Sequence, residues 1–253
     1  KLKTDYNHEI ASDVNENLAY KKYKKNIKKE ITASEIIKDP PNNLKKKTFI
    51  DRFIKKSLLI QALNEDSPNG DITTQLLGNA SHEVTAALIA KQTGIFYGEE
   101  IITTLASLQS FTVDTTTHPL KNGMALTKGQ TVCKLTGPFS TLLTTERVLL
   151  NFLQHLSGVA TLTNEFVKTL NDSTIKILDT RKTTPLLRDL EKQAVKAGGG
   201  TNHRWNLSDM ILLKENHLSV LENQNNLDDL SNRIKEQKEK NPALKAEIEI
   251  ESY

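Results

Sequence analysis

The sequence predicts an α/β protein in which an α+β domain is followed by parallel strands that alternate with helices. Two observations predict it. In the first half, the apolar residues Val84, Ala86, Leu88 and Ala90 fall at every second position, as in a half-buried strand, and a stretch with helical spacing precedes them. In the second half, three short apolar runs alternate with helical stretches, an order typical of parallel strands joined by crossover helices.

The composition is that of a soluble globular protein. Of the 253 residues, 37% are hydrophobic and 26% are charged. No apolar run approaches the roughly 18 residues that span a bilayer, and no secretory signal opens the chain. The single cysteine, Cys133, excludes an internal disulfide and a cysteine-based metal cluster. We therefore expect a cytoplasmic protein that has no membrane partner.

Residues 1–47 differ from the rest in charge. They contain twelve lysines against seven acidic residues and end at the turn cluster Pro40-Pro41-Asn42-Asn43. Such a basic segment is able to touch nucleic acid, but a solvated helix or a tail without fixed structure is the more ordinary interpretation. We predict a Lys-rich N-terminal extension, helical or unstructured, and no nucleic-acid partner.

Residues 48–150 have the pattern of an α+β domain. Apolar residues recur at helical spacing from Phe49 to Leu59, and the turn Asp66–Gly70 follows. After the strand-like run at 84–90, the segment from Met124 to Leu143 alternates short apolar stretches with Gly and Pro, which indicates strands and turns.

Residues 151–253 have the alternating pattern. A helix is predicted from Thr144 to Leu170, with Thr144 or Thr145 as its N-cap. Strands are predicted at 175–178, 210–213 and 246–250, and helices at about 184–197 and 227–240.

Each predicted strand ends in charged residues. The first continues into Asp179-Thr180-Arg181-Lys182, the second into Lys214-Glu215-Asn216-His217, and the third carries Glu249 and Glu251. The Gly198–Gly200 run, which lets backbone approach a ligand, precedes His203 and Arg204. Each piece alone is ordinarily surface or loop. Because the carboxyl ends of parallel barrel strands share one face, the recurring basic residues predict an anion-binding site without naming a reaction. Its cations are Arg181, Lys182, His203, Arg204 and Lys214.

At these residues the chain resembles the quinolinate phosphoribosyltransferases. The similar motifs are Asp179–Pro185, Arg188 with Glu191-Lys192 and Ala194, Ala197–Arg204, and Asp209–His217. Earlier matches are Ala62–Asp66, Gly70–Thr74, Gly94 to Gly98, Gly123, Gly129, Gly137, Glu146-Arg147, Asn151–Gln154 and Leu156–Gly158. The resemblance covers the chain from about Thr48 to its end.

The resemblance implies an N-terminal α/β sandwich domain, a type II phosphoribosyltransferase-like α/β barrel, and a homodimer with shared active sites. It implies that quinolinate and phosphoribosyl pyrophosphate are converted, with Mg²⁺, to nicotinate mononucleotide, pyrophosphate and carbon dioxide in NAD biosynthesis. Carried over by position, Arg147 would reach quinolinate from the neighbouring subunit. Arg181, Lys182, His203, Arg204 and Lys214 would bind the substrates, with Lys182, Lys214 and Glu249 as the catalytic residues. A metal contact through Glu249 would be indirect.

Departures from the family pattern leave alternatives open. Leu186 stands where the family usually has Gly after Pro185, so that loop is expected to differ. We also expect the sequence to stop before the barrel is complete; if Tyr253 is the true C-terminus, an open and inactive barrel is predicted. The alternatives are a relative of the molybdenum-transport type and a truncated, non-catalytic remnant.

Overall fold

The computed structural model describes residues 43–78, 80–117, 119–223 and 227–250. Nearly all of the predicted N-terminal extension, and Glu251, lie outside these ranges. The chain divides into two compact units. The first contains residues up to Ala86 together with Glu100–Val113 and Leu135–Leu150, and the second contains Ala87–Glu99, Asp114–Lys134 and the chain from Asn151.

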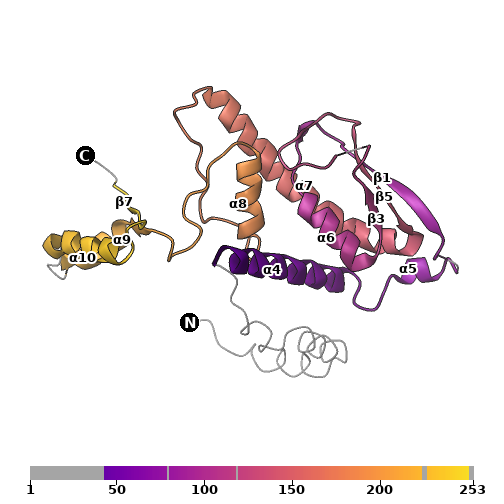
Figure 1. Ribbon diagram of the computed structural model, residues 1–253, viewed down its shortest axis with the longest axis horizontal. Coiled ribbons are helices and arrows are strands. Elements are labelled where there is room, and N and C mark those ends of the chain that lie inside the picture. Colours follow the sequence, from indigo (N-terminus) through magenta and orange to yellow (C-terminus); the bar gives the residue numbers. More distant parts are fainter. Residues whose placement is uncertain (1–42, 79, 118, 224–226, 251–253) are drawn as a thin grey trace, which may run out of the picture. The chain divides into compact units, whose positions relative to one another are not determined.

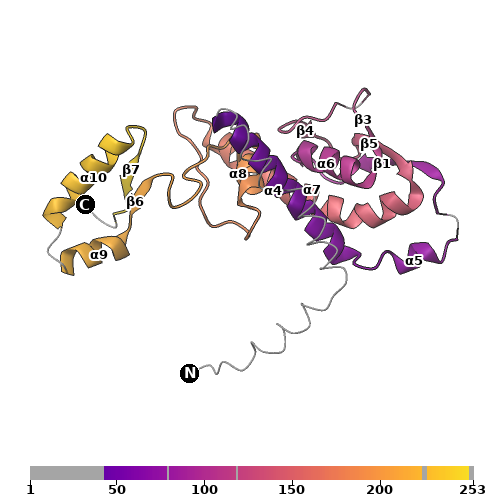
Figure 2. The same ribbon diagram turned by 60° about the horizontal axis from the view of Figure 1, so that its bottom comes forward.

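The first unit combines helices with a small sheet. Helix α4 (Asn43–Asp66) and the short α5 (Ile72–Gln75) precede β1 (Glu83–Ile89), which crosses into the second unit. The sheet has the order β1-β5-β3, with β5 at Thr131–Pro138 and β3 at Thr112–Asp114. The strand predicted at 84–90 is therefore confirmed. Helix α6 (Glu99–Gln109) lies beside this sheet in both ribbon views (Figures 1 and 2).

The core of the first unit forms where α6 meets the sheet. Ile101, Ile102, Leu105 and Ala106 are the buried residues of α6, and Leu105 is 0% exposed. A Cβ atom added at Gly137 of β5 would lie 2.7 Å from Cβ of Phe111, so strand and helix end approach too closely for a side chain there.

Helix α7 (Phe139–Leu170) begins five residues earlier than predicted. Pro138 immediately precedes it, a position at which the missing N–H costs nothing. Thr144 and Thr145 are not N-caps, because their hydroxyls donate to the carbonyls of Ser140 and Thr141, one turn back inside the helix.

The second unit contains a two-stranded antiparallel pairing and a β-α-α-β segment. Strand β2 (Gly94–Ile95) pairs with β4 (Ala125–Leu126). After α7 and α8 (Arg188–Ala197), β6 (Ile211–Leu213) is followed by α9 (Glu215–Asn223), α10 (Leu227–Lys240) and β7 (Ala246–Ile248). Strands β6 and β7 are parallel, as predicted, and lie together in Figure 2. Helix α10 has the predicted bounds.

Two predicted elements are much shorter in the structure, and the strand predicted at 246–250 ends at Ile248. The strand predicted at 175–178 is reduced to a single parallel bridge between Leu178 and Thr201. Ile175 and Leu178 are half exposed there, so the part of the chain that the structure describes offers them little sheet to pack against. The helix predicted from 184 begins at Arg188, because Leu186 has a φ of 67°, which a right-handed helix does not admit.

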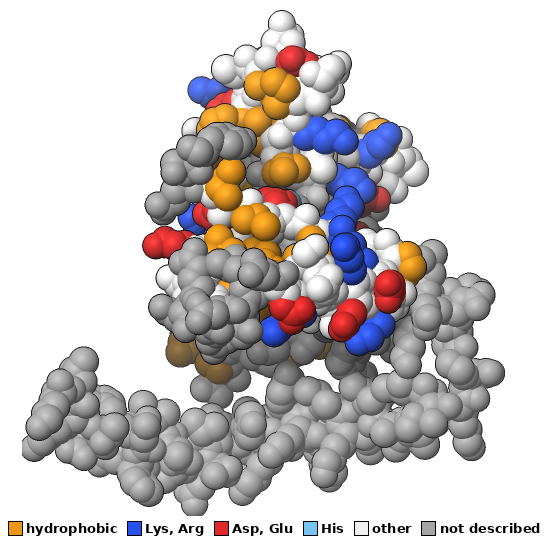
Figure 3. Space-filling view, turned by 90° about the vertical axis from the view of Figure 1, so that its left-hand side faces the viewer, with side chains coloured by type: hydrophobic (Ala, Val, Ile, Leu, Met, Phe, Trp, Pro, Cys, Tyr) orange, Lys and Arg blue, Asp and Glu red, His pale blue; other side chains and the backbone are white. Residues whose placement is uncertain are grey.

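Some apolar side chains in the β-α-α-β segment are exposed, among them Val220, Ile248 and Ile250. Figure 3 shows hydrophobic side chains gathered beside a band of Lys and Arg on one face. Within the described residues, no helix has the length and apolar character needed to cross a membrane.

Candidate active site

Four backbone segments of the second unit bring the charged residues together. The bridge between Leu178 and Thr201 sets the segments 179–182 and 202–204 next to each other in parallel. Strands β6 and β7 run parallel in register, so Lys214 and Glu249 both follow the carboxyl ends of their strands. Polar residues at the carboxyl ends of parallel strands are where α/β proteins place their ligands.

Lys214, Glu249 and Lys182 form one electrostatic cluster. Nζ of Lys214 donates a hydrogen bond to Oε2 of Glu249. This bond lowers the pKa of Glu249, and the charge of Lys182 acts in the same direction. The backbone N–H of Lys214 donates to Nδ1 of His217, 3.0 Å away, which fixes the start of α9. The Glu249 carboxylate is therefore hydrogen-bonded to one lysine and stabilised in its ionised form by the charge of a second.

His203 and Arg204 belong to the neighbouring segment. Nε2 of His203 lies 2.9 Å from Oε2 of Glu247, the residue two positions before Glu249 on β7. Arg204 is buried, with 8% of its surface exposed. The structure thus connects the His203 segment with β7, and Lys214 bonds Glu249, the residue directly after that strand.

Arg181 carries the buried side-chain polar atom that lacks a partner within the described residues. Its Nε has no hydrogen-bond acceptor. Buried guanidinium nitrogens are almost always satisfied, because an unpaired buried donor costs about 1–3 kcal/mol. An arginine fork is well matched to a carboxylate or phosphate, so Arg181 is suited to an anionic ligand.

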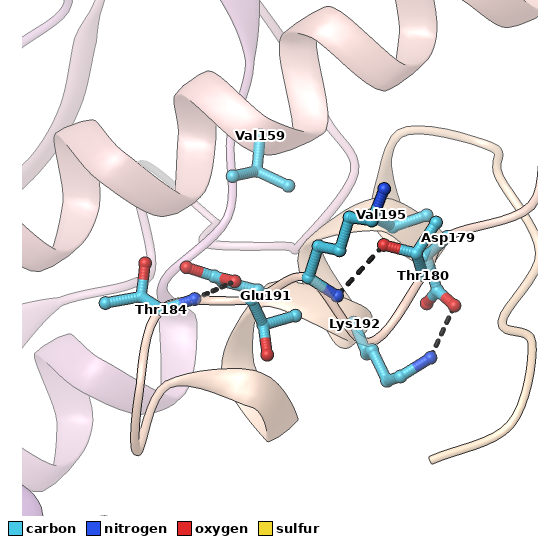
Figure 4. Close-up of a pocket in the computed structure, with 9 residues that line it drawn as sticks. Val159, Asp179, Thr180, Thr184, Glu191, Lys192 and Val195 are labelled. Carbon is cyan, nitrogen blue, oxygen red and sulfur yellow. Dashed lines mark hydrogen bonds and ion pairs between the residues drawn. The ribbon is translucent and has the colours of Figure 1, made fainter. Parts of the chain in front are cut away.

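A cavity of about 320 Å³ lies beside these residues (Figure 4). Lys182 lines it, and so do two charged residues of α8, Glu191 and Lys192. The complete lining is Val159, Asp179, Thr180, Lys182, Thr183, Thr184, Glu191, Lys192 and Val195. In the sequence, Asp179, Glu191 and Lys192 stood only as parts of motifs, with no role assigned to them.

Lys192 is fully buried and bonded to Asp179. The exposed fraction is 0% for the Lys192 side chain and 6% for that of Asp179. Asp179 Oδ1 also accepts from the His203 N–H at 2.9 Å, and its Oδ2 accepts from Nδ2 of Asn202 at 2.6 Å. One carboxylate thus joins α8 to the His203 segment. The amphipathic pattern of α8 contained no signal that a lysine would be buried there.

The Gly198–Gly200 run is required for packing within the chain, a role that the sequence did not indicate; that it also approaches a ligand stays a prediction. A Cβ atom at Gly198 would lie 2.2 Å from the carbonyl oxygen of Ala160 on α7. At Gly200 it would lie 2.7 Å from a methyl carbon of Val195. Gly198 and Gly200 let the end of α8 and the chain after it pass close to α7.

Two predicted features concern groups outside this cluster. Arg147 is an exposed residue of α7 in the first unit. For a metal, the described residues contain no group of three His, Cys, Asp or Glu side chains placed to hold an ion. Mg²⁺ ordinarily binds through one or two carboxylates together with substrate phosphates and water. Glu249, which follows the end of β7, fits the role of such a carboxylate for a magnesium ion carried by a polyphosphate.

The sequence matches two domain models of one family. Residues 71–157 match the N-terminal domain of quinolinate phosphoribosyl transferase, and residues 159–253 match its C-terminal domain. Among curated proteins, the chain is 49% identical over 166 residues to a probable nicotinate-nucleotide pyrophosphorylase (carboxylating) of Bacillus subtilis, covering 65% of this chain and 56% of that protein. It is 34% identical over 195 residues to the corresponding Mycobacterium leprae protein, covering 76% and 66%. The chain thus spans a little over half to about two thirds of these relatives' lengths.

Solved structures give the same result. A crystal structure of NadC from Streptococcus pyogenes superposes with a TM-score of 0.70 at 38% identity, over 79% of this chain and 69% of that chain. The nicotinate-nucleotide pyrophosphorylase of Francisella tularensis superposes with a TM-score of 0.69 at 31% identity, over 80% and 68%. The α/β architecture is therefore shared with these proteins, and the chain belongs to the quinolinate phosphoribosyltransferase family.

Proposed function

We propose that this protein transfers a phosphoribosyl group from phosphoribosyl pyrophosphate to quinolinate and releases pyrophosphate and carbon dioxide, forming nicotinate mononucleotide for NAD biosynthesis. The observation that carries the proposal is the hydrogen bond between Lys214 and Glu249, whose pKa the charge of Lys182 also lowers, together with the unpaired buried Nε of Arg181, the residue before Lys182. The matched relatives named above do not favour the molybdenum-transport alternative.

Quinolinate would be held by the arginines. Its two carboxylates match the planar donors of Arg181 and Arg204, and the open Nε of Arg181 gains the acceptor that it lacks. His203 would add a further contact. Arg147 would reach the substrate from the second subunit of a homodimer, which agrees with its exposed position. We further propose that residues 151–253 form part of an α/β barrel in a cytoplasmic enzyme.

Phosphoribosyl pyrophosphate would be bound by Lys182 and Lys214, whose compact charges suit phosphate oxygens. Mg²⁺, when bound with the pyrophosphate, would neutralise part of its charge. As the bond from the anomeric carbon to pyrophosphate breaks, its electron pair leaves with pyrophosphate and positive charge develops on the ribose carbon. Glu249 is a fixed negative charge suited to stabilise that carbon while the pyridine nitrogen forms the new bond.

Carbon dioxide is lost after the transfer. The ring nitrogen is then positively charged, so the carbon–carbon bond to the adjacent carboxylate breaks with its electron pair moving into the ring. A proton from solvent fills the vacated ring position. No separate electron-accepting cofactor is required, because the pyridinium ring accepts the electrons itself.

The test is release of labelled carbon dioxide from carboxyl-labelled quinolinate. We expect release only when phosphoribosyl pyrophosphate is also present, and no turnover with nicotinate, which lacks the departing carboxylate. Pyrophosphate release with nicotinate would overturn the assignment of substrate. A folded protein that produces no carbon dioxide under these conditions would instead support the non-catalytic remnant.

A further inference from the structure

Two adjacent charged residues of α8 hold opposite ends of the loop that carries Arg181 and Lys182. We propose that Glu191 and Lys192 are positioning residues, which set the geometry of that loop and do not themselves contact substrate. The proposal rests on the function proposed above for the loop. Figure 4 shows the arrangement, with Thr184 on the Glu191 side and Asp179 on the Lys192 side.

The ammonium of Lys192 has its bonding directions used within the chain. It donates to Oδ1 of Asp179 and, at 3.4 Å, to the carbonyl oxygen of His203. The ring of Trp205 lies within cation–π distance, with its centroid 5.6 Å from Nζ. Because the side chain is 0% exposed, a substrate phosphate would have to displace one of these partners to reach it.

Asp179 extends this anchor to the neighbouring segment. Both of its oxygens accept hydrogen bonds from residues that directly precede Arg204, namely the Asn202 amide and the His203 N–H. The Asn202 amide also donates to the carbonyl oxygen of Lys192, 2.7 Å away. The Lys192–Asp179 pair therefore fixes the start of the 179–182 segment and the 202–204 segment at the same time.

Glu191 holds the other end of the loop. Its Oε2 accepts from the backbone N–H of Thr184 at 3.1 Å, and its Oε1 lies 2.7 Å from Nε2 of His155 on α7. Burial raises the pKa of Glu191, but the hydrogen bonds from Thr184 and His155 outweigh burial and leave it lowered. Both carboxylate oxygens are thus committed to the chain's own groups.

The competing role for Lys192 is direct contact with a phosphate, since it lines the cavity with Lys182. The two roles predict different activities when Asp179 is substituted together with Lys192. Lys192→Met alone leaves the Asp179 carboxylate buried without its cation. Adding Asp179→Asn removes that charge, and the amide oxygen of Asn still accepts from the His203 N–H, while the bond that the second carboxylate oxygen accepts from Asn202 is lost. A positioning role predicts recovery in the double variant, whereas a direct contact would stay lost.

The experiment compares Lys192→Met, the double variant Asp179→Asn/Lys192→Met, and Lys196→Met as a matched control. Lys196 is an exposed lysine one turn further along the same helix. We expect Lys192→Met to lower kcat/KM by about 10- to 100-fold, as for other outer groups that orient site residues, and to raise KM for both substrates. The double variant should recover part of this loss, and Lys196→Met should behave as the wild type.

The other end is tested with Glu191→Ala and Glu191→Gln. Glutamine keeps an oxygen for the Thr184 N–H, so we expect it to retain most of the activity that alanine loses. The proposal is overturned if the double variant is no better than Lys192→Met and only the KM for phosphoribosyl pyrophosphate rises, or if Glu191→Gln and Glu191→Ala are equally impaired.

Trp205 gives a readout that does not depend on turnover. It is the single tryptophan of the chain, so its quenching by acrylamide reports the packing around Lys192. We expect greater quenching in Lys192→Met than in the double variant. We also expect Lys192→Met to lose more of its affinity for inorganic pyrophosphate than the double variant does. If the wild type releases no carbon dioxide, the proposed function fails, while quenching and pyrophosphate binding still decide the positioning role. Equal quenching and equal pyrophosphate binding in the two variants would contradict it.

Discussion

Helices α6 and α8 have nearly the same length, 11 and 10 residues, but their buried faces differ in chemistry. The face of α6 is apolar throughout, with Ile101, Ile102, Leu105 and Ala106 buried. Two of the four buried residues of α8, Glu191 and Lys192, are charged.

The difference separates stability from site geometry. Fully burying an aliphatic side chain contributes about 1.5–3 kcal/mol, so α6 stabilises the fold through the apolar surface that it removes from water. A buried ion pair contributes little net stability, because desolvation offsets the attraction, but its partners are fixed in direction. We therefore expect substitutions on α6 to change the free energy of unfolding, and substitutions in the loop that α8 holds, such as those at Arg181, to change activity. Removing one partner of the buried Lys192–Asp179 pair is expected to lower stability as well, because it leaves an uncompensated buried charge.

The largest expected effect is on α6. Leu105→Ala removes a side chain that is 0% exposed, so we expect it to lower the free energy of unfolding by about 3–5 kcal/mol. Urea denaturation measures the loss, and Leu105→Met, which conserves volume, should cost less than about 1.5 kcal/mol. Below the unfolding midpoint kcat should be unchanged. A large fall in kcat without loss of stability would break the contrast between the helices.

The loop that α8 holds should respond in the opposite way. Arg181→Ala removes the proposed partner of a quinolinate carboxylate, and we expect a loss on the order of 2–5 kcal/mol in transition-state binding. Steady-state kinetics measure it as a fall in kcat/KM, with the urea midpoint close to that of the wild type. Activity like that of the wild type would remove Arg181 from the site.

A pH measurement sharpens the electrostatic side of the comparison. Lys214 lowers the pKa of Glu249, so in the wild type this carboxylate stays ionised below its ordinary value of 4.5. The stabilisation is present above that value and is lost as pH falls through the lowered pKa. In Lys214→Met the pKa should move up toward 4.5, with Lys182 still opposing a full return. An NMR titration of the Glu249 carboxyl carbon measures the shift, and an unchanged pKa would show that the hydrogen bond is unimportant.

The smallest expected effect lies at the entrance to α8. Leu186 has a φ of 67° and is 83% exposed, so its side chain gains little burial while its backbone is strained. Leu186→Gly should raise the free energy of unfolding by about 0.5–1 kcal/mol, since relief of strain exceeds the added entropy of the unfolded chain. Leu187→Gly is the control and should destabilise, because Leu187 has a φ of −95° and is half-buried.

The best-predicted elements are those for which hydrophobic periodicity and flanking turn residues indicate the same boundaries. Helix α10 and the parallel pair of β6 and β7 follow from these two signals, and the structure has them nearly as predicted. Boundaries were wrong where a local signal was ambiguous. Thr144 and Thr145 are good N-cap residues in sequence, yet their hydroxyls bond back within a helix that begins directly after Pro138.

The family follows from the order of motifs along the chain, and so do the charged strand ends that suit an anionic ligand. Which of those charged side chains are exposed to a ligand depends on the three-dimensional packing. Lys182 is exposed near Glu249, whereas Lys192 is sealed against Asp179, and the two lysines look alike in the sequence. They differ because burial and hydrogen-bond partners come from segments distant along the chain, such as the contact between Asp179 and His203, which no local pattern encodes.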